Sequence, residues 1–122
     1  MDAIDNILNR VSARLLKEPY PSNEEMNKVY KAALRAPDHA WLRPSSFIQV
    51  TGDGIKELSK IFEEYAKTIP NIKDEIITKY KNAPFRAPMI IILVSTFKDH
   101  PKVPGIEQKL STAASAQNIL LS

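Results

Sequence analysis

Arginine, histidine and tryptophan gather in one short segment, residues 35–47, which reads RAPDHAWLRPSSF. The segment begins where a helical pattern must stop, because Pro37 disfavours the α conformation of Ala36. Loops held by rigid elements carry functional groups more often than those elements do. We therefore take this cationic loop as the candidate functional site.

Two residues of the loop leave their roles open. His39 follows Asp38, which could raise the pKa of the imidazole, but an aspartate in a turn more often caps the nearby backbone. Trp41 could be a stacking platform or an interface anchor, or equally a core aromatic that covers a helix end.

A phosphate-bearing ligand would have to be held by side chains. The chain has three glycines, and their positions allow neither a dinucleotide fingerprint nor a P-loop. Arg10 and Ser12 are the candidates, because a guanidinium binds phosphate in two-pronged fashion and a hydroxyl adds a directional donor. The alternative, which the pattern alone favours, is that both belong to the solvated face of an amphipathic helix.

The sequence predicts neither a metal site nor a catalytic side chain. The two histidines lie far apart in sequence, cysteine is absent, and no serine lies in a nucleophile-elbow context. The acidic pairs at residues 63–64 and 74–75 are adjacent in predicted helices and so face apart, which excludes an acid/base dyad.

Composition indicates one domain spanning residues 1–122. The chain is 43% hydrophobic and 25% charged, as in soluble globular proteins, and carries a net charge of +3. Acidic and basic residues are interspersed, so this small excess is weak evidence for nucleic acid binding. We expect a cytoplasmic protein, because the N-terminus is acidic, cysteine is absent, and the aliphatic run at residues 89–94 is too short to cross a bilayer.

Hydrophobic periodicity predicts the elements that position these groups. Apolar residues at helical spacing indicate a first helix from Ile4 to Leu15 with one buried stripe, and Arg10 and Ser12 lie on its polar face. A second helix is expected to begin at a capping box formed by residues 22 and 25.

Three more helices and two strands complete the predicted pattern. The helices are expected between residues 55 and 70, between 72 and 80 and from 106 onward, and the strands at 47–51 and 89–94. The second strand is continuously apolar, which is typical of a central strand covered on both faces. Two strands do not make a stable sheet and the last helix lacks a stop signal, so we expect the chain to end before its fold does.

Four motifs in one order give the chain a resemblance to a known family. They are NRVSAR at residues 9–14, RAPDHAWLRP at 35–44, NAPFRAP at 82–88 and VPGIEQ at 103–108. Together they resemble the nitroreductase superfamily, and within it the small YdjA-type NAD(P)H nitroreductases. The resemblance implies an α+β fold, a nitroreductase-like α/β/α sandwich with a central mixed sheet flanked by helices, here incomplete at the C-terminus.

The resemblance also implies an FMN-dependent oxidoreductase that works as a homodimer with flavin at the subunit interface. Arg10, Val11 and Ser12 would hold the flavin phosphate and ribityl chain from one subunit, and Arg35 and His39 would approach the same FMN from the other. Hydride would pass from NAD(P)H by way of the flavin to an electron-poor acceptor such as a nitroaromatic or a quinone.

Three departures from the family pattern support an alternative. Val11 stands where a second arginine is usual, Ser45 stands where tryptophan is usual, and the chain stops before the family's glycine-rich turn and later strands. The alternative is a non-catalytic, truncated remnant or dimerisation module with an incomplete flavin site. A third interpretation, a basic nucleic-acid binder, rests only on the sequence pI of 9.2.

Overall fold

The computed structural model describes residues 2–122, which form two compact units. The first, called the terminal unit here, holds the segment ending at Ser12 together with Pro21–Ile48 and Ile92–Ser122. The second, called the middle unit, holds Ala13–Tyr20 and Gln49–Ile91. The groups predicted to bind a ligand all lie in the terminal unit.

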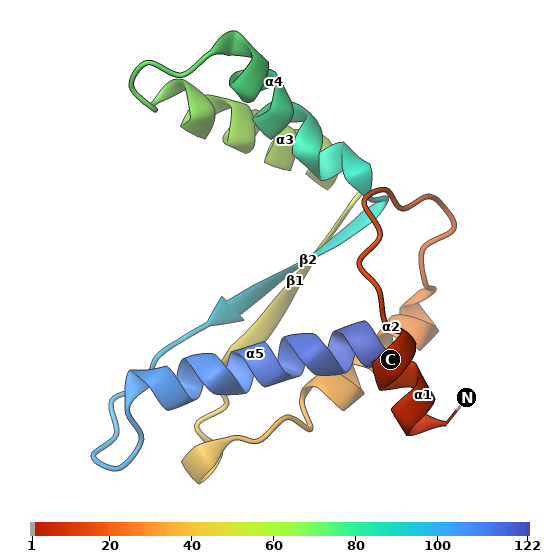
Figure 1. Ribbon diagram of the computed structural model, residues 1–122. Coiled ribbons are helices and arrows are strands. Elements are labelled where there is room, and N and C mark those ends of the chain that lie inside the picture. Colours follow the sequence, from red (N-terminus) through yellow and green to blue (C-terminus); the bar gives the residue numbers. More distant parts are fainter. Residues whose placement is uncertain (1) are drawn as a thin grey trace. The chain divides into compact units, whose positions relative to one another are not determined.

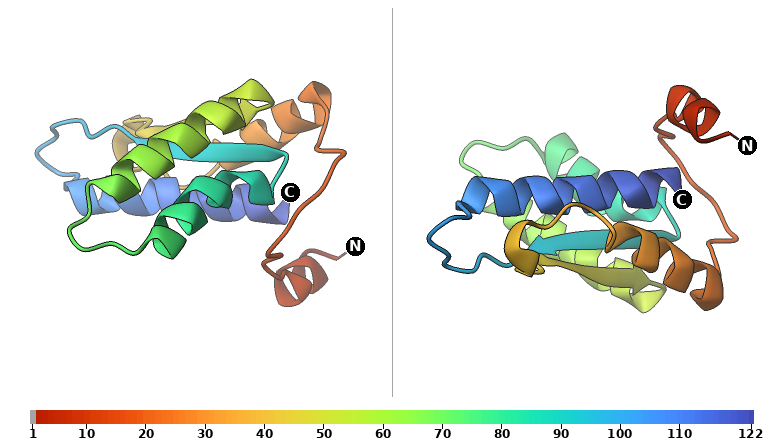
Figure 2. Two further views of the ribbon diagram at one scale, coloured as in Figure 1. Left: turned by 90° about the horizontal axis from the view of Figure 1, so that it is seen from above. Right: turned by 90° about the horizontal axis from the view of Figure 1, so that it is seen from below.

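The terminal unit is built around two packed helices, α2 (Asn23–Ala33) and α5 (Gly105–Leu121), which lie side by side (Figure 1 and Figure 2). The predicted capping box starts α2: the Ser22 hydroxyl accepts from Glu25 N at 3.3 Å, and the Glu25 carboxylate accepts from Ser22 N at 2.8 Å. These hydrogen bonds from Ser22 lower the pKa of Glu25. Ala33 is buried, and Asn118 Nδ2 of α5 donates to the carbonyl of Ala32 at 2.9 Å.

The first helix is shorter and more exposed than predicted. Helix α1 spans Ala3–Asn9, so the prediction that it reaches Leu15 was wrong. The backbone beyond Asn9 is not helical. Leu16 N donates to the carbonyl of Arg86 at 2.8 Å, where a helix would have bonded it to a residue four positions earlier. The expected buried stripe was also wrong, since α1 has no buried residue and Leu8 is 75% exposed.

The middle unit is a helical hairpin of α3 (Asp53–Lys67) and α4 (Asp74–Asn82), followed by the short 3₁₀ helix η2 (Ala83–Arg86). Both α-helices were predicted. Buried Ser59 joins them by donating to the carbonyl of Lys81 at 2.7 Å, and Glu63 of α3 pairs with Lys81 at 3.1 Å. Tyr65 of α3 is 59% exposed, and its ring lies 6.1 Å from that of Tyr80 of α4.

Two strands, β1 (Ser45–Thr51) and β2 (Met89–Ser95), form a two-stranded sheet to which each unit contributes part of both strands. The strands are antiparallel, as the bond from Thr96 N to the carbonyl of Pro44 at 2.8 Å requires, because it joins the end of β2 to the start of β1. The second strand was predicted correctly in extent but not in environment. Within residues 2–122 it pairs with β1 alone, and none of its residues is buried.

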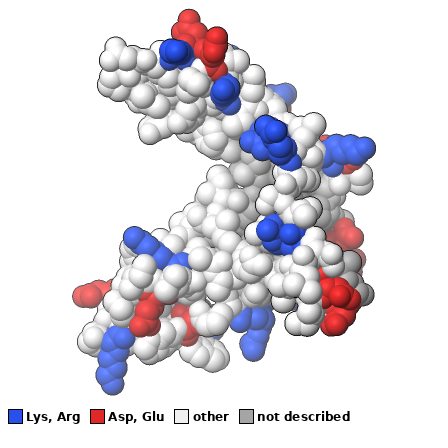
Figure 3. All heavy atoms as spheres, viewed as in Figure 1, with Lys and Arg blue, Asp and Glu red and all other residues white. Residues whose placement is uncertain are grey.

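Charges are mixed over the surface. Acidic and basic side chains lie interspersed on the face shown in Figure 3, as the sequence suggested. Among the helices of residues 2–122, none combines the length and apolar character needed to span a membrane.

Candidate functional site

The backbone of the cationic loop is held in an unusual conformation by one carboxylate. Ala40 and Trp41 have positive φ angles of 59° and 53°, a region that non-glycine residues seldom occupy. The Asp38 carboxylate accepts hydrogen bonds from Leu42 N at 3.1 Å and from Arg43 N at 2.8 Å. Asp38 is therefore a backbone cap, as the structural interpretation of this residue proposed. Residues kept in such conformations often mark functional loops.

Helix α5 and the segment before it hold the loop from the other side. His39 Nδ1 lies 2.7 Å from Glu107 Oε2 in the first turn of α5, so the acidic partner of His39 is Glu107 and not its neighbour in sequence. Lys98 Nζ donates to the carbonyl of Leu42. Lys98 is fixed in turn by buried Gln108, whose amide accepts from Lys98 N at 2.9 Å and donates to Lys98 O at 2.8 Å.

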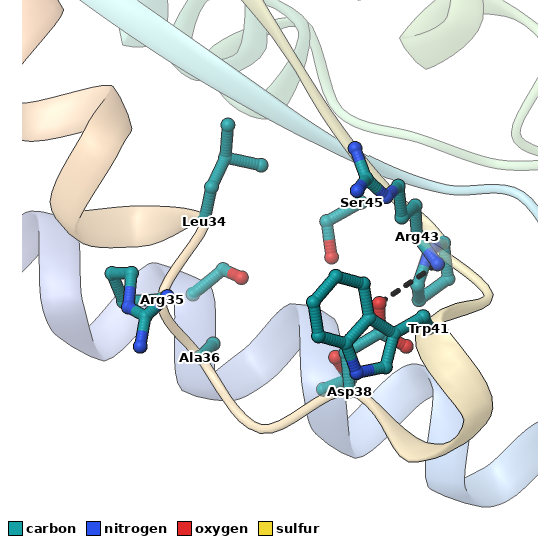
Figure 4. Close-up of a pocket in the computed structure, with 10 residues that line it drawn as sticks. Leu34, Arg35, Ala36, Asp38, Trp41, Arg43 and Ser45 are labelled. Atoms are coloured by element: carbon teal, nitrogen blue, oxygen red, sulfur yellow. Dashed lines mark hydrogen bonds between the residues drawn. The ribbon is translucent and has the colours of Figure 1, made fainter.

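A pocket of about 350 Å³ lies between the loop and α5 (Figure 4). Trp41 forms part of its wall and is 78% exposed, which rules out the interpretation of this residue as a core aromatic. The Arg43 guanidinium lies 5.8 Å from the centre of the indole, within range of a cation–π contact. The pocket is lined by Leu34, Arg35, Ala36, Asp38, Trp41, Arg43, Pro44, Ser45, Ser111 and Ser115.

The serines of α5 were missed by sequence reasoning, which predicted this helix but assigned none of its side chains to a site. Ser111 and Ser115 are 8% and 2% exposed and contribute hydroxyls to the pocket wall. Their spacing of four residues, which puts them on one helical face, was the available signal. Ser45 reaches the same helix, since its hydroxyl lies 2.8 Å from that of Thr112.

The predicted phosphate-binding residues lie together just after α1. Arg10 Nη1 donates to the Ser12 hydroxyl at 3.2 Å, and Val11 between them is 81% exposed. All three lie in extended or irregular backbone, so the expectation that Arg10 and Ser12 lie on the polar face of a helix was wrong. They nevertheless form one exposed group of a guanidinium and a hydroxyl, here called the Arg10–Ser12 cluster.

Within a single chain the Arg10–Ser12 cluster lies far from His39. The Arg10–Ser12 cluster follows α1, which contacts the C-terminal end of α5 through Asn6 Nδ2 and the carbonyl of Leu121 at 2.5 Å. His39 contacts Glu107 at the opposite end of this 17-residue helix. At 1.5 Å per residue the two ends are roughly 25 Å apart. Arg35 lines the pocket, whereas His39 does not.

Metal binding finds no support in the part of the chain that the structure describes. Residues 2–122 contain no group of three or more His, Asp or Glu side chains that could hold an ion. The arrangement instead provides cationic donors, hydroxyls and one exposed aromatic ring, groups suited to binding an anionic, ring-containing molecule.

Comparison with known proteins gives a consistent family. The sequence model of the Nitroreductase family matches residues 7–122. "Putative NAD(P)H nitroreductase YdjA" of Escherichia coli (strain K12) is 38% identical over 115 residues, which are 94% of this chain and 62% of that protein. The chain thus spans less than two thirds of the length of this relative.

Solved structures agree on the fold. A nitroreductase-like family protein from Bacillus cereus superposes with a TM-score of 0.79 at 19% identity, covering 99% of this chain and 63% of that one. A nitroreductase with bound FMN from Bacteroides fragilis NCTC 9343 gives a TM-score of 0.70 at 17% identity, with the same coverage of 99% and 63%. The α+β fold of the chain is therefore nitroreductase-like, and it covers part of the fold seen in those structures. Because the family match includes both the cationic loop and the whole Arg10–Ser12 cluster, the chain belongs to the nitroreductase family.

Proposed function

We propose that the chain contributes to an FMN-dependent oxidoreductase that uses NAD(P)H to reduce an electron-poor acceptor, such as a nitroaromatic or a quinone. The observation that carries the proposal is the family match over residues 7–122. The name of the E. coli relative supports NAD(P)H as reductant, and the B. fragilis structure supports FMN as cofactor. The match also runs through both compact units, which supports one domain across residues 1–122.

The Arg10–Ser12 cluster has a chemistry that suits the flavin phosphate. Arg10 carries a positive charge and several N–H donors, and the Ser12 hydroxyl lies 3.2 Å from its Nη1. Val11 offers its backbone N–H but no side-chain donor. In this proposal Arg10 and Ser12 bind the phosphate, with Val11 beside them along the ribityl chain.

Arg35 and His39 are proposed to approach the flavin from the second subunit of a homodimer. In one chain the Arg10–Ser12 cluster and His39 lie at opposite ends of α5, so a site that uses both requires two chains. Exposed apolar side chains on α1 support such an association: Ile4, Ile7 and Leu8 are each more than half exposed. Burial of this helix face against a partner would supply the contacts that the single chain lacks.

When bound, the flavin would supply the hydride-accepting and hydride-donating ring. The residues of the chain bind and orient. The cationic groups Arg10 and Arg35 would stabilise negative charge on the cofactor, and the conformation imposed by Asp38 would keep the loop ordered before a ligand arrives.

The decisive experiment is flavin retention by the purified chain. The chain is mixed with excess FMN and desalted, and the visible flavin absorbance is measured, followed by NAD(P)H oxidation with a nitroaromatic or quinone acceptor. Retained flavin and acceptor-dependent oxidation are expected. A dimer that retains no flavin and oxidises no NAD(P)H would instead establish the alternative, a non-catalytic dimerisation module.

A further inference from the structure

The pocket beside Trp41 combines a surface for an aromatic ring with an uncompensated positive charge. The indole of Trp41 is mostly exposed, Arg43 lies close to it, and Arg35 lies across the pocket, at the left of Figure 4. Asp38 is the one acidic residue in the lining. Its carboxylate is occupied by the N–H groups of Leu42 and Arg43, so it faces the backbone and leaves both guanidinium groups available to a ligand.

The wall opposite the loop is polar and can accept or donate hydrogen bonds. Ser111 and Ser115 of α5 are buried against the pocket, and Ser45 begins β1 at its edge. Hydroxyls of this kind complete the coordination of a small anion or a carbonyl oxygen. A volume of about 350 Å³ accommodates a substituted single ring and lies at the lower end of ordinary ligand sites.

The loop is also preorganised. Ala40, Trp41 and Arg43 all have positive φ angles, of 59°, 53° and 49°. The Asp38 carboxylate and Lys98 hold this conformation from two sides, through the hydrogen bonds to Leu42. A binding surface that is already ordered loses less conformational entropy when a ligand arrives.

We propose that this pocket binds a planar aromatic carboxylate, with Arg43 pairing with the carboxylate and the Trp41 indole packing against the ring. Its role as the site of an anionic aromatic acceptor rests on the proposed function, whereas the binding itself does not. A planar carboxylate matches the two-pronged donor geometry of a guanidinium, and a ring deficient in electrons stacks favourably on an electron-rich indole. A neutral aromatic of the same shape would use only the second contact.

The chain carries its own probe for this proposal, because Trp41 is its only tryptophan. The chain without added flavin is titrated with 4-nitrobenzoate and, separately, with the neutral isostere 4-nitrobenzamide, and the quenching of Trp41 fluorescence is corrected for ligand absorbance. We expect saturable quenching by 4-nitrobenzoate with a Kd about tenfold lower than that of the amide, as one charge-assisted contact provides. Equal affinities, or quenching that does not saturate, would overturn the proposal.

Arg43→Gln tests the assigned partner, and Lys31→Gln is its matched control. Lys31 is an exposed residue in the last turn of α2 outside the pocket lining, so its replacement removes the same charge from the same unit. The preference for the carboxylate is expected to disappear in Arg43→Gln and to persist in Lys31→Gln. A preference that survives in folded Arg43→Gln, or that disappears in Lys31→Gln, contradicts the role of Arg43.

A measurement on the unaltered chain covers the case in which Arg43→Gln does not fold. Raising the ionic strength screens an exposed charge pair, so the Kd of 4-nitrobenzoate should rise with salt while that of 4-nitrobenzamide stays constant. A carboxylate affinity that is independent of salt contradicts the proposal.

Other anionic ring compounds distinguish the source of the ligand. Tighter binding of adenosine 2′,5′-bisphosphate than of 4-nitrobenzoate would show that the pocket binds the nucleotide of the reductant. Arg43-dependent quenching of Trp41 fluorescence by FMN would show that it binds the cofactor. Either result overturns the assignment to an acceptor. A chain that prefers 4-nitrobenzoate yet retains no flavin would refute the proposed function and leave the aromatic-carboxylate site standing.

Discussion

Replacing Asp38 by alanine should disorder the cationic loop while leaving the helices in place. The carboxylate accepts two backbone hydrogen bonds, at 3.1 and 2.8 Å, and these hold the loop in which Ala40, Trp41 and Arg43 have positive φ. Charge-assisted hydrogen bonds contribute about 1.5 kcal/mol each at the lower end of their range, which suits a half-buried group. Their loss therefore costs about 3 kcal/mol.

Part of this cost is recovered because the loop is no longer constrained. Each residue that leaves a disfavoured backbone region regains about 1 kcal/mol, so relaxation of one or two of the three residues Ala40, Trp41 and Arg43 leaves a net loss of about 1 to 2 kcal/mol. The loss should be concentrated in the loop, because both hydrogen bonds of the Asp38 carboxylate join it to backbone N–H groups of the same loop. Asp38→Asn keeps one side-chain carbonyl oxygen as acceptor and should lose about half as much.

The assay uses Trp41 as a local reporter and circular dichroism as a global one. In Asp38→Ala, fluorescence anisotropy of Trp41 should fall and its quenching by acrylamide should increase in the absence of denaturant, with the far-ultraviolet spectrum unchanged. Asp99→Ala removes an exposed carboxylate from another loop of the same unit and should change neither signal. Unaltered anisotropy and quenching in Asp38→Ala would refute the view that the carboxylate orders the loop.

Three further predictions concern the flavin phosphate, the helical hairpin and the cap of α2. Arg10→Ala should weaken FMN binding by about 1.5 kcal/mol, the lower end for a charge-assisted contact at an exposed site, as measured by flavin titration, and an unchanged affinity would place the phosphate elsewhere. Ser59→Ala should lower the free energy of unfolding by about 1 kcal/mol in urea titration, because the 2.7 Å hydrogen bond from the buried Ser59 hydroxyl to the carbonyl of Lys81 is lost; Thr78→Ala, at an exposed residue of α4, is the control. Glu25 has a pKa lowered below 4.5 by the hydrogen bonds from Ser22, so its contribution to stability is present above its unfolded pKa and is lost as pH falls through the folded value. The stability difference between the chain and Glu25→Gln should accordingly shrink on acidification through that range, and a difference independent of pH would contradict the role of the charge.

Local signals in the sequence were sufficient for most helices. Ser22 and Glu25 predicted the start of α2, because a capping box depends only on residues three apart. The helices of the hairpin, α3 and α4, followed from hydrophobic periodicity. By contrast, the segment after α1 leaves the helical pattern and Leu16 bonds to Arg86, 70 positions away, a contact that no local pattern indicates.

The candidate site was predicted as a segment but not as an arrangement. The density of charged and aromatic residues identified the loop, and the turn chemistry of Asp38 correctly suggested a backbone cap. The partner of His39 could not be foreseen, because Glu107 lies 68 positions away on another helix. The hydroxyls of Ser111 and Ser115 were missed for a related reason, since burial against the loop is decided by tertiary packing.

The clamp between Gln108 and Lys98 makes the loop sensitive to the register of α5. A side-chain amide here takes the place of a neighbouring peptide group, because it both accepts from and donates to the backbone of one residue. Glutamate at this position would lose the donor, and asparagine would be one methylene too short to reach. One residue inserted within the first turn of α5 would rotate the two sides of the insertion relative to each other by about 100° and direct Glu107 and Gln108 away from their partners. A residue inserted at positions 99–102 would lengthen only the segment that connects Lys98 to α5 and would leave the helix register unchanged. Tolerance to insertion should therefore change sharply within a few positions.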